Sequence, residues 1–279
     1  MAISSMLVPV GLDIRDEEVL RYVCGLSAQA VRKVLVMTAV EASGLEAPIL
    51  AAEVDRARER LALMANSGMR ECNMEVELRV VTGDPIESIL ALAHQGDIDV
   101  ICCGTSGKSI VDAMFAGSVS ERLFASGKIR TMTVRYDLLE SVDDPGQLAR
   151  DFARRLVVPT DFSAAATRAW LSAVERPREA IDTLTALHVL HSDASTADRM
   201  SAEALMRGLA MIAEGHGIEA QTEILVGNPH EVVLEYLEGS KATGVITGQH
   251  GTGGLRKAML GGLSLKLLRE APCVVVVQP

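Results

Sequence analysis

The sequence predicts an α/β protein built from two tandem doubly wound domains, each with a five-stranded parallel sheet covered by helices on both faces. Three observations lead to this prediction. Short apolar runs alternate with stretches of helical period along the whole chain, which is the pattern of repeated β-α units. The chain repeats itself about halfway. Aromatic residues make up only 3% of the 279 residues and hydrophobic residues 48%, so Val, Leu, Ile, Ala and Met must fill the cores, as is common around buried parallel strands.

The repeat is clearest in its prolines and glycines. RRLVVPTDFS echoes SSMLVPVGLD, and ILVGNPHEVVL echoes VVTGDPIESIL. Pro159 follows Pro9 by 150 residues. Four glycines each recur after 144 residues, namely Gly83 with Gly227, Gly104 with Gly248, Gly107 with Gly251 and Gly117 with Gly261. Chance similarity between apolar strands does not preserve such spacing. We therefore expect domain one at residues 1–138, an acidic linker containing Pro145-Gly146 at 139–153, and domain two at 154–279.

Each element of the first copy follows from a local pattern. Apolar or alternating runs predict strands, and an apolar stripe at helical spacing beside charged residues predicts a helix. The turn Gly83-Asp84-Pro85 puts a proline at the start of a further helix. In chain order we expect strands at 6–10, 34–40, 76–81, 100–103 and 129–134, with helices at 16–30 and 50–64, after Pro85 and after Gly117. Because crossovers separate the strands, the sheet should be parallel, and the second copy should repeat it up to a last strand at 273–277.

The stretch ICCGTSGKSIVDAMFAGS contains Gly107-Lys108-Ser109 and so invites comparison with an ATP-binding P-loop. That loop has the pattern G-x-x-x-x-G-K-[ST], but the position of its first glycine is Cys102 here. A P-loop also follows the first strand of its domain, whereas this stretch follows the fourth. The second copy reads GQHGTGG and lacks the Lys-Ser pair. The P-loop interpretation therefore fails, and Lys108 is expected to be a solvated loop lysine.

The two copies share a longer glycine frame, G-x-x-G followed after nine residues by another glycine. It comprises Gly104, Gly107 and Gly117 followed by Ser118 in copy one, and Gly248, Gly251 and Gly261 followed by Gly262 in copy two. Together with the Val-Pro stretch that ends the first strand of each copy, this frame resembles the universal stress proteins. Nucleotide-binding members of that family carry G-x-x-G-x9-G-[ST] after strand four and V-P-V-D at the end of strand one. The resemblance covers nearly the whole chain, in a tandem arrangement.

This resemblance implies a sheet of order 3-2-1-4-5, with a ligand where strands one and four end. Glycines there allow the backbone to approach ribose and phosphates, and the following helix offers free N–H groups to phosphate. Ser118 also fits a capping box with Glu121, so its hydroxyl either caps the helix or contacts phosphate. The implied nucleotide-binding residues are Pro9, Val10, Ala39, Cys103, Gly104, Gly107, Gly117, Ser118, Val119 and Ser120 in copy one, and Pro159, Thr160, Asp161, Val189, Gly248, His250, Gly251, Gly261, Gly262, Leu263 and Ser264 in copy two.

Each copy departs from the family pattern at one point. In copy one Gly11 replaces the aspartate of V-P-V-D, which contacts the nucleoside in binding relatives, and Asp13 lies two residues further on. Copy two keeps Asp161 but has Gly262 in place of the hydroxyl residue. A missing hydroxyl costs about 1 kcal/mol, which a phosphate site lined by backbone tolerates. We therefore expect at least one copy to bind nucleotide.

The resemblance thus implies an ATP- or AMP-binding protein of stress response or signalling, whose ligand is ATP or another adenine nucleotide, with or without Mg²⁺. The alternative is a protein-interaction module whose nucleotide sites have degenerated. The sequence offers no identifiable general base for ATP hydrolysis, so slow ATPase activity is expected at most and no catalytic residue is assigned. The apolar last strands of the two copies are expected to pair as a pseudo-dimer within the chain, and a homodimer is a further option.

Charge and composition narrow the remaining classes. The net charge of −10 disfavours nucleic acid and anionic membrane surfaces as partners. No signal peptide and no apolar run long enough to span a membrane are found, so a cytoplasmic protein is expected. His188 and His191 lack a second Cys/His pair, so no metal site is predicted, and His250 is equally a ligand contact or a solvated histidine. The cysteines show neither CxxC nor disulfide spacing, which fits a reducing compartment, and the adjacent pair is expected to be buried: Cys24, Cys72, Cys102, Cys103 and Cys273.

Overall fold

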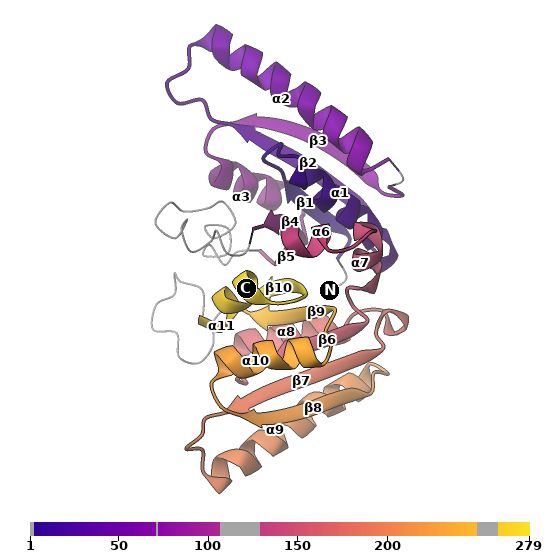
Figure 1. The fold of residues 1–279 in the computed structure, drawn as a ribbon, viewed down its shortest axis with the longest axis vertical. Helices are drawn as coiled ribbons and strands as arrows, with labels where there is room; N and C mark the ends of the chain where they lie inside the picture. The colour runs from indigo at the N-terminus through magenta and orange to yellow at the C-terminus, as the bar shows by residue number, and fades with distance from the viewer. Residues whose placement is uncertain (1–2, 71, 107–128, 250–261) are drawn as a thin grey trace. The chain divides into compact units, whose positions relative to one another are not determined.

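The computed structural model describes residues 3–70, 72–106, 129–249 and 262–279. The chain divides into two compact units, residues 3–150 and residues 151–279. Figure 1 shows the order of the helices and strands along the chain.

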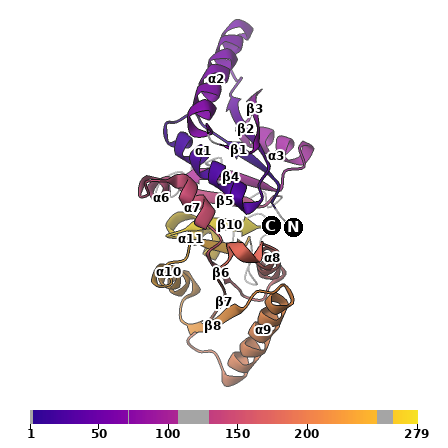
Figure 2. The same ribbon diagram turned by 90° about the vertical axis from the view of Figure 1, so that its right-hand side faces the viewer.

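The first unit contains a parallel sheet in the order β3-β2-β1-β4-β5. Its helices α1 and α2 cover one face of the sheet and α3 covers the other (Figure 2). The strands are β1 (Ser5–Pro9), β2 (Lys33–Val40), β3 (Glu75–Thr82), β4 (Val100–Thr105) and β5 (Thr131–Arg135). The helices are α1 (Arg15–Gly25), the 3-10 turn η1 (Leu26–Gln29), α2 (Ala47–Gly68) and α3 (Pro85–Gln95). The predicted strand order is therefore confirmed.

The second unit repeats this topology in the order β10-β9-β6-β7-β8. Helices α8 and α9 lie on one face of its sheet and α10 lies on the other (Figure 2). The strands are β6 (Arg155–Pro159), β7 (Thr183–Leu190), β8 (Ala220–Val226), β9 (Gly244–Gly248) and β10 (Val274–Gln278). The helices are α8 (Ala164–Val174), the 3-10 turn η2 (Arg178–Ala180), α9 (Thr196–Gly215), α10 (Pro229–Gly239) and α11 (Gly262–Glu270).

The turn that the sequence predicts before the third helix of each copy is present in both units. Asp84 caps α3 by accepting a 3.0 Å hydrogen bond from the Glu87 N–H, and Asn228 caps α10 by accepting one of 2.9 Å from the His230 N–H. The glycines just before these caps have φ angles of 126° and 149°, in the region that favours glycine over residues with a Cβ. The Gly-Asx-Pro sequence therefore fixes where each of these helices begins.

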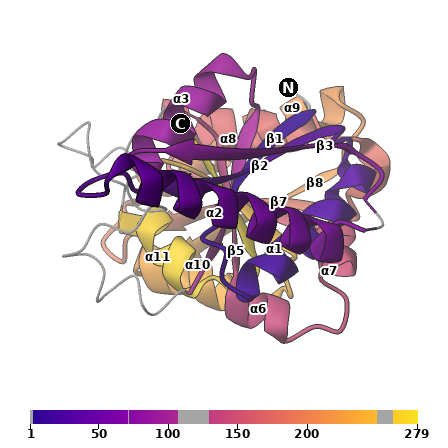
Figure 3. The same cartoon turned by 90° about the horizontal axis from the view of Figure 1, so that it is seen from above.

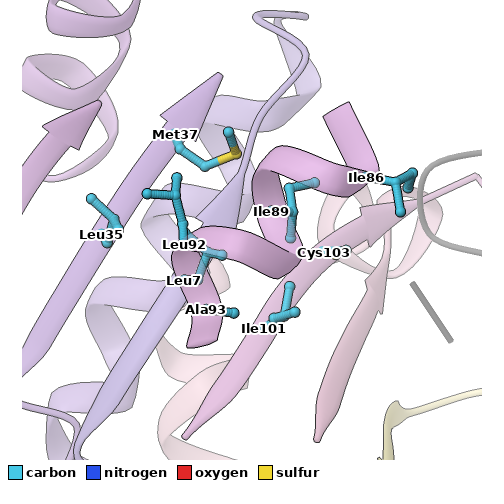
Figure 4. Close-up of a cluster of buried hydrophobic side chains, with 9 residues drawn as sticks. All are labelled: Leu7, Leu35, Met37, Ile86, Ile89, Leu92, Ala93, Ile101 and Cys103. Atoms are coloured by element: carbon cyan, nitrogen blue, oxygen red, sulfur yellow. The ribbon is translucent and has the colours of Figure 1, made fainter. Parts of the chain in front are cut away.

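Packing of α3 on the sheet makes a core of aliphatic side chains in the first unit (Figure 4). The α3 side chains face those from β1, β2 and β4, and the cluster comprises Leu7, Leu35, Met37, Ile86, Ile89, Leu92, Ala93, Ile101 and Cys103. On the other face, α2 runs alongside β3 (Figure 3). These cores contain few rings, as the low aromatic content predicts.

The segment that the sequence predicts as a linker is largely helical. It contains the end of α6 (Tyr136–Glu140) and all of α7 (Pro145–Asp151). The first unit extends through Arg150, whose carbonyl oxygen accepts a 2.9 Å hydrogen bond from Gln29 Nε2. A Cβ at Gly25 would overlap the Gly146 carbonyl, so glycine at position 25 allows α7 to approach α1 closely.

At the amino ends of β1 and β4, one carboxylate joins the two strands. Asp99 Oδ2 accepts hydrogen bonds from the Ser4 N–H at 2.7 Å, the Ser4 hydroxyl at 2.8 Å and the Ser5 N–H at 3.0 Å. Partial burial raises the pKa of Asp99, but these hydrogen bonds outweigh it and the pKa is lowered overall. The ionised carboxylate therefore stabilises the start of the central strand.

We expect Asp99→Ala to lower the free energy of unfolding by about 1 to 2 kcal/mol at neutral pH, because hydrogen bonds to a charged acceptor are lost. The lowered pKa means that this stabilisation is present above the carboxyl group's unfolded pKa of about 3.9 and is lost as the pH falls through the folded pKa. Urea unfolding of both proteins at several pH values would measure the difference. Asp193→Ala, at an exposed loop position, is the control. If the difference in unfolding free energy between the unmodified protein and Asp99→Ala stayed the same down to acidic pH, this account would be wrong.

Candidate functional site

The candidate site lies where the strand order of each sheet reverses, at the carboxyl ends of β1 and β4 in the first unit and of β6 and β9 in the second. The β1–β2 ladder continues to the pair Pro9–Met37, but the β1–β4 ladder ends at Leu7–Ile101. The second unit behaves identically. Its β6–β7 ladder continues to Pro159, whereas its β6–β9 ladder ends at Val157.

A proline explains why these inner ladders end early. The Val10 N–H donates to the Met37 carbonyl of β2 at 2.8 Å. Because successive backbone nitrogens of a strand point to opposite neighbouring strands, the nitrogen of the preceding residue, Pro9, points toward β4. Proline has no N–H group and cannot donate the next hydrogen bond of the β1–β4 ladder. The Thr160 N–H makes the equivalent 2.8 Å bond to Leu187, so Pro159 faces β9. The repeated Val-Pro dipeptide thus ends the inner ladder at the reversal point of both sheets.

In the first unit a buried carboxylate occupies this region. Asp16, in the first turn of α1, is only 4% exposed. Its Oδ2 atom accepts hydrogen bonds from the Gly11 N–H at 2.9 Å and the Asp13 N–H at 3.1 Å. Gly11 is the position where the family pattern has an aspartate. A carboxylate five residues further on, in the first turn of α1, therefore reaches back to the strand end, and Asp13 does not take that place.

Tyr136 completes this cluster from the far side. It begins α6, directly after β5, and its hydroxyl donates a 2.8 Å hydrogen bond to Asp16 Oδ1. A Cβ added to Gly104 would lie 2.6 Å from the Tyr136 ring, so glycine at this position makes room for the tyrosine. The Arg15 guanidinium lies over the ring, 4.7 Å from its centroid. Burial raises the pKa of Tyr136 far above its usual value, and Asp16 adds to this, so the hydroxyl keeps its proton.

The second unit lacks this cluster at the corresponding positions. With the offset of 150, Ala165 and Ala166 stand where the first unit has Arg15 and Asp16. A Cβ at Gly248 would lie 2.7 Å from Ala165 atoms, so the glycine allows α8 to pack directly on β9. The first glycine of the frame therefore serves packing in both units, against a tyrosine in one and a helix backbone in the other.

The end of β6 carries the polar groups of the second unit. Asp161 is half-buried, and its Oδ1 accepts a 3.0 Å hydrogen bond from the Ser163 N–H. The Thr160 hydroxyl accepts the Phe162 N–H at 3.0 Å, and the Thr160 carbonyl lies 2.8 Å from His188 Nδ1. Because a carbonyl only accepts, Nδ1 carries the proton. The His188 ring also lies 4.5 Å from the Phe162 ring, between centroids, so His188 ties β7 to the end of β6.

At the start of α11 the predicted residues also have partners within the protein. The Ser264 side chain is buried, and its hydroxyl donates a 2.7 Å hydrogen bond to the Gly248 carbonyl. Gly262 is exposed, but a Cβ there would lie 2.7 Å from His230 Cε1. Glycine at 262 therefore accommodates the His230 ring beside the first turn of α11.

The structure gathers the described candidates at the carboxyl edge of each sheet. Ala39 and Val189 lie half-buried near the ends of β2 and β7. Cys103 is buried in the core under α3, and burial raises its pKa to about 12. The remaining candidates lie outside the described residues: Gly107, Gly117, Ser118, Val119, Ser120, His250, Gly251 and Gly261.

Sequence reasoning missed the main polar groups of the first unit. Asp16 resembles an ordinary acidic residue of a first helical turn, and Tyr136 ends the repeated stretch IRTMTVRY, which predicts only a last strand. Only its contact with Gly104 connects Tyr136 to the glycine frame. In the described part of the chain, no group of three or more His, Cys, Asp and Glu side chains is arranged to hold a metal ion. None of the described helices combines the length and apolar character that a membrane span requires.

The sheets, their crossovers and the early end of both inner ladders define a tandem pair of doubly wound α/β domains, each with one point where the strand order reverses. The model of the universal stress protein family matches residues 3–135 and 153–279. The chain therefore belongs to the universal stress protein family.

Known relatives cover one or both halves. Universal stress protein MJ0531 of Methanocaldococcus jannaschii is 25% identical over 161 residues, which is 52% of this chain and 92% of that protein. The crystal structure of a universal stress protein from Archaeoglobus fulgidus DSM 4304 covers 98% of this chain and 95% of its own, with 24% identity and a TM-score of 0.77, and shares the fold. A universal stress protein in complex with cAMP covers 49% of this chain and 99% of its own, with 17% identity and a TM-score of 0.42.

We expect Tyr136→Phe to lower the free energy of unfolding by about 1.5 to 3 kcal/mol, because a hydrogen bond to a buried charged acceptor is lost. Denaturant unfolding followed by circular dichroism would measure the loss. Tyr236→Phe, which removes a hydroxyl from a half-buried position on α10, is the matched control. Equal stability of the two variants would contradict the role given to Tyr136.

Proposed function

We propose that this protein binds an adenine nucleotide at the reversal point of its second unit and acts through binding in stress response or signalling. The observation that carries the proposal is Asp161. Its carboxylate follows the proline that ends the inner ladder, and it corresponds to the family position that contacts the nucleoside. The ligand is ATP or another adenine nucleotide, with or without Mg²⁺.

The second unit is favoured over the first because of what lies beside the strand end. In the first unit the N–H of Gly11 already donates to Asp16, and that carboxylate is held further by Tyr136. A ligand there would have to displace a buried, hydrogen-bonded carboxylate, which is costly. In the second unit, alanines replace Arg15 and Asp16, and the carboxylate is supplied by the strand end itself.

The chemistry of the second unit suits a nucleoside. A carboxylate accepts several hydrogen bonds and so suits ribose hydroxyls or an exocyclic amine. The ends of β7 and β6, with the half-buried Val189 on β7, lie near the place expected for the base. Helix α11 begins at Gly262, and N–H groups of a first helical turn favour phosphate. Because Ser264 already donates to the Gly248 carbonyl, backbone groups should contribute more to phosphate binding than this hydroxyl does.

We expect ATP, ADP or AMP at millimolar concentration to raise the melting temperature of the purified protein, because a ligand at about 100 times its Kd adds about 2.7 kcal/mol to the stability of the folded state. Asp161→Ala should weaken the affinity about tenfold, corresponding to about 1.4 kcal/mol. Calorimetric titration with and without Mg²⁺ would measure this. Asp193→Ala is again the control for removing one negative charge.

Two outcomes would redirect the proposal. If denatured protein releases no adenine nucleotide and no nucleotide shifts the melting temperature, nucleotide binding is wrong and the protein-interaction module becomes the better account. If Asp161→Ala leaves the affinity unchanged while Asp16→Ala alters it, the first unit is the binding half. The predicted pairing of the last strands of the two copies, and a homodimer, stay predictions from the sequence.

A further inference from the structure

Two cysteines that lie 48 residues apart in sequence come together in the first unit. Cys24 is in the last turn of α1, and Cys72 follows the end of α2. Both are half-buried free thiols, and both lie beside the end of α2, Cys24 at the Gly68 carbonyl oxygen and Cys72 at the Met69 carbonyl oxygen. Sequence spacing does not reveal this pair, because it depends on how α1 packs beside α2.

Close packing of the two helices brings the thiols together. A Cβ at Gly68 would lie 2.9 Å from Leu20 Cβ and 3.0 Å from the Glu17 carbonyl oxygen, so glycine allows the end of α2 to contact α1. The Ser67 hydroxyl donates a 2.6 Å hydrogen bond to Glu17 Oε1, and Cys24 Sγ lies 3.7 Å from the Gly68 carbonyl oxygen. The α2 end is therefore fixed against α1 from its first turn, at Glu17, to its last, at Cys24 (Figure 3).

A turn then folds Cys72 back toward this contact. The Cys72 N–H donates a 3.0 Å hydrogen bond to the Met69 carbonyl oxygen, just past the end of α2. The two cysteines thus approach each other from elements that are held together by other contacts.

The environment gives the two thiols different reactivities. Hydrogen bonding from the Cys24 thiol lowers the pKa of Cys72, and the Met74 N–H adds to this against partial burial. The same hydrogen bond, together with burial, raises the pKa of Cys24. A thiolate is the attacking form, so Cys72 is the nucleophile and Cys24 the resolving partner. The other cysteines, Cys102, Cys103 and Cys273, are buried.

We propose that Cys24 and Cys72 are a modification site that reacts with a hydroperoxide and closes to a disulfide. The Cys72 thiolate attacks the outer oxygen of the peroxide, the O–O bond breaks, and the inner oxygen leaves as alcohol, or as water from hydrogen peroxide. Sulfur of the resulting Cys72 sulfenic acid is attacked by Cys24, the S–O bond breaks and water leaves. Overall two thiols lose two electrons and two protons, the peroxide gains them, and a thiol reductant reverses the change.

The cross-link would restrain α1, the helix that also carries Asp16 of the candidate site. This helix holds Cys24 in its last turn and Asp16 in its first. A disulfide would fix the α1 end to the chain that enters β3. The oxidised protein should therefore melt at a higher temperature than the reduced protein, because the unfolded chain is constrained by a closed loop.

Peptide mapping of the full-length protein tests the site directly. After treatment with hydrogen peroxide, alkylation without reduction and proteolysis, we expect a linked peptide pair containing Cys24 and Cys72, which disappears on reduction. The buried cysteines should remain thiols and become alkylated only after denaturation. If Cys24 and Cys72 are still alkylated as free thiols when one of the buried cysteines is already oxidised, the proposal is wrong.

Single variants test which cysteine attacks. In Cys24→Ser, peroxide should leave a sulfenic acid on Cys72 that a dimedone probe traps. In Cys72→Ser only burial still raises the pKa of Cys24, and Cys24 should react with peroxide more slowly than Cys72 does in Cys24→Ser. Equal trapping in both variants would overturn the assignment of Cys72 as the nucleophile. Should either variant fail to fold, the linked peptide from the unmodified chain still decides whether the site exists.

Discussion

The early end of the inner ladder in each sheet depends on one missing hydrogen-bond donor. Pro9 and Pro159 end the central strand of their sheets and face the next inner strand, where a residue with an N–H group would extend the ladder. Without that donor the inner ladder ends first, while the ladder on the other side of the same strand continues. A central strand normally excludes proline. Here proline occurs at the same register position in both sheets, where it costs one ladder hydrogen bond. It thereby fixes the place where side chains or a ligand can approach between the two inner strands.

The two units use that position differently. In the first, Asp16 from the helix after the first strand and Tyr136 from the helix after the last strand converge on it, and the cluster is held by backbone N–H groups and a phenolic hydroxyl. In the second, the helix at the same place begins with alanines and packs on Gly248, and the carboxylate belongs to Asp161 at the strand end. The same duplicated fold therefore holds the fully buried carboxylate of Asp16 in the first unit and the half-buried carboxylate of Asp161 in the second.

The sequence was sufficient for the fold because the fold depends on repeated, local signals. Strand periodicity, the Gly-Asx-Pro turns and the doubled glycine spacing each indicate an element or its boundary, and the sheet order follows from the family resemblance. The candidate sites depend on contacts over long sequence separations. Tyr136 reaches Asp16 across 120 residues, and His188 reaches Thr160 across 28. Cys24 and Cys72 meet only because Gly68 allows two helices to touch. Such pairs leave no periodicity, so single-sequence patterns did not reveal them.

The glycine frame by itself is therefore weak evidence for a ligand. Gly104 and Gly248 are each required by a neighbouring protein group, a tyrosine ring in one unit and a helix backbone in the other, and Gly262 accommodates a histidine ring. A glycine that makes room for the protein would be retained with or without a nucleotide. The carboxylate near the strand end is more informative. Its sequence position differs between the two units, whereas the packing glycines occupy equivalent positions in both. For that reason, the proposal that the second unit binds nucleotide and the first does not depends mainly on Asp161 and Asp16. It depends less on the glycine motif that first suggested phosphate binding.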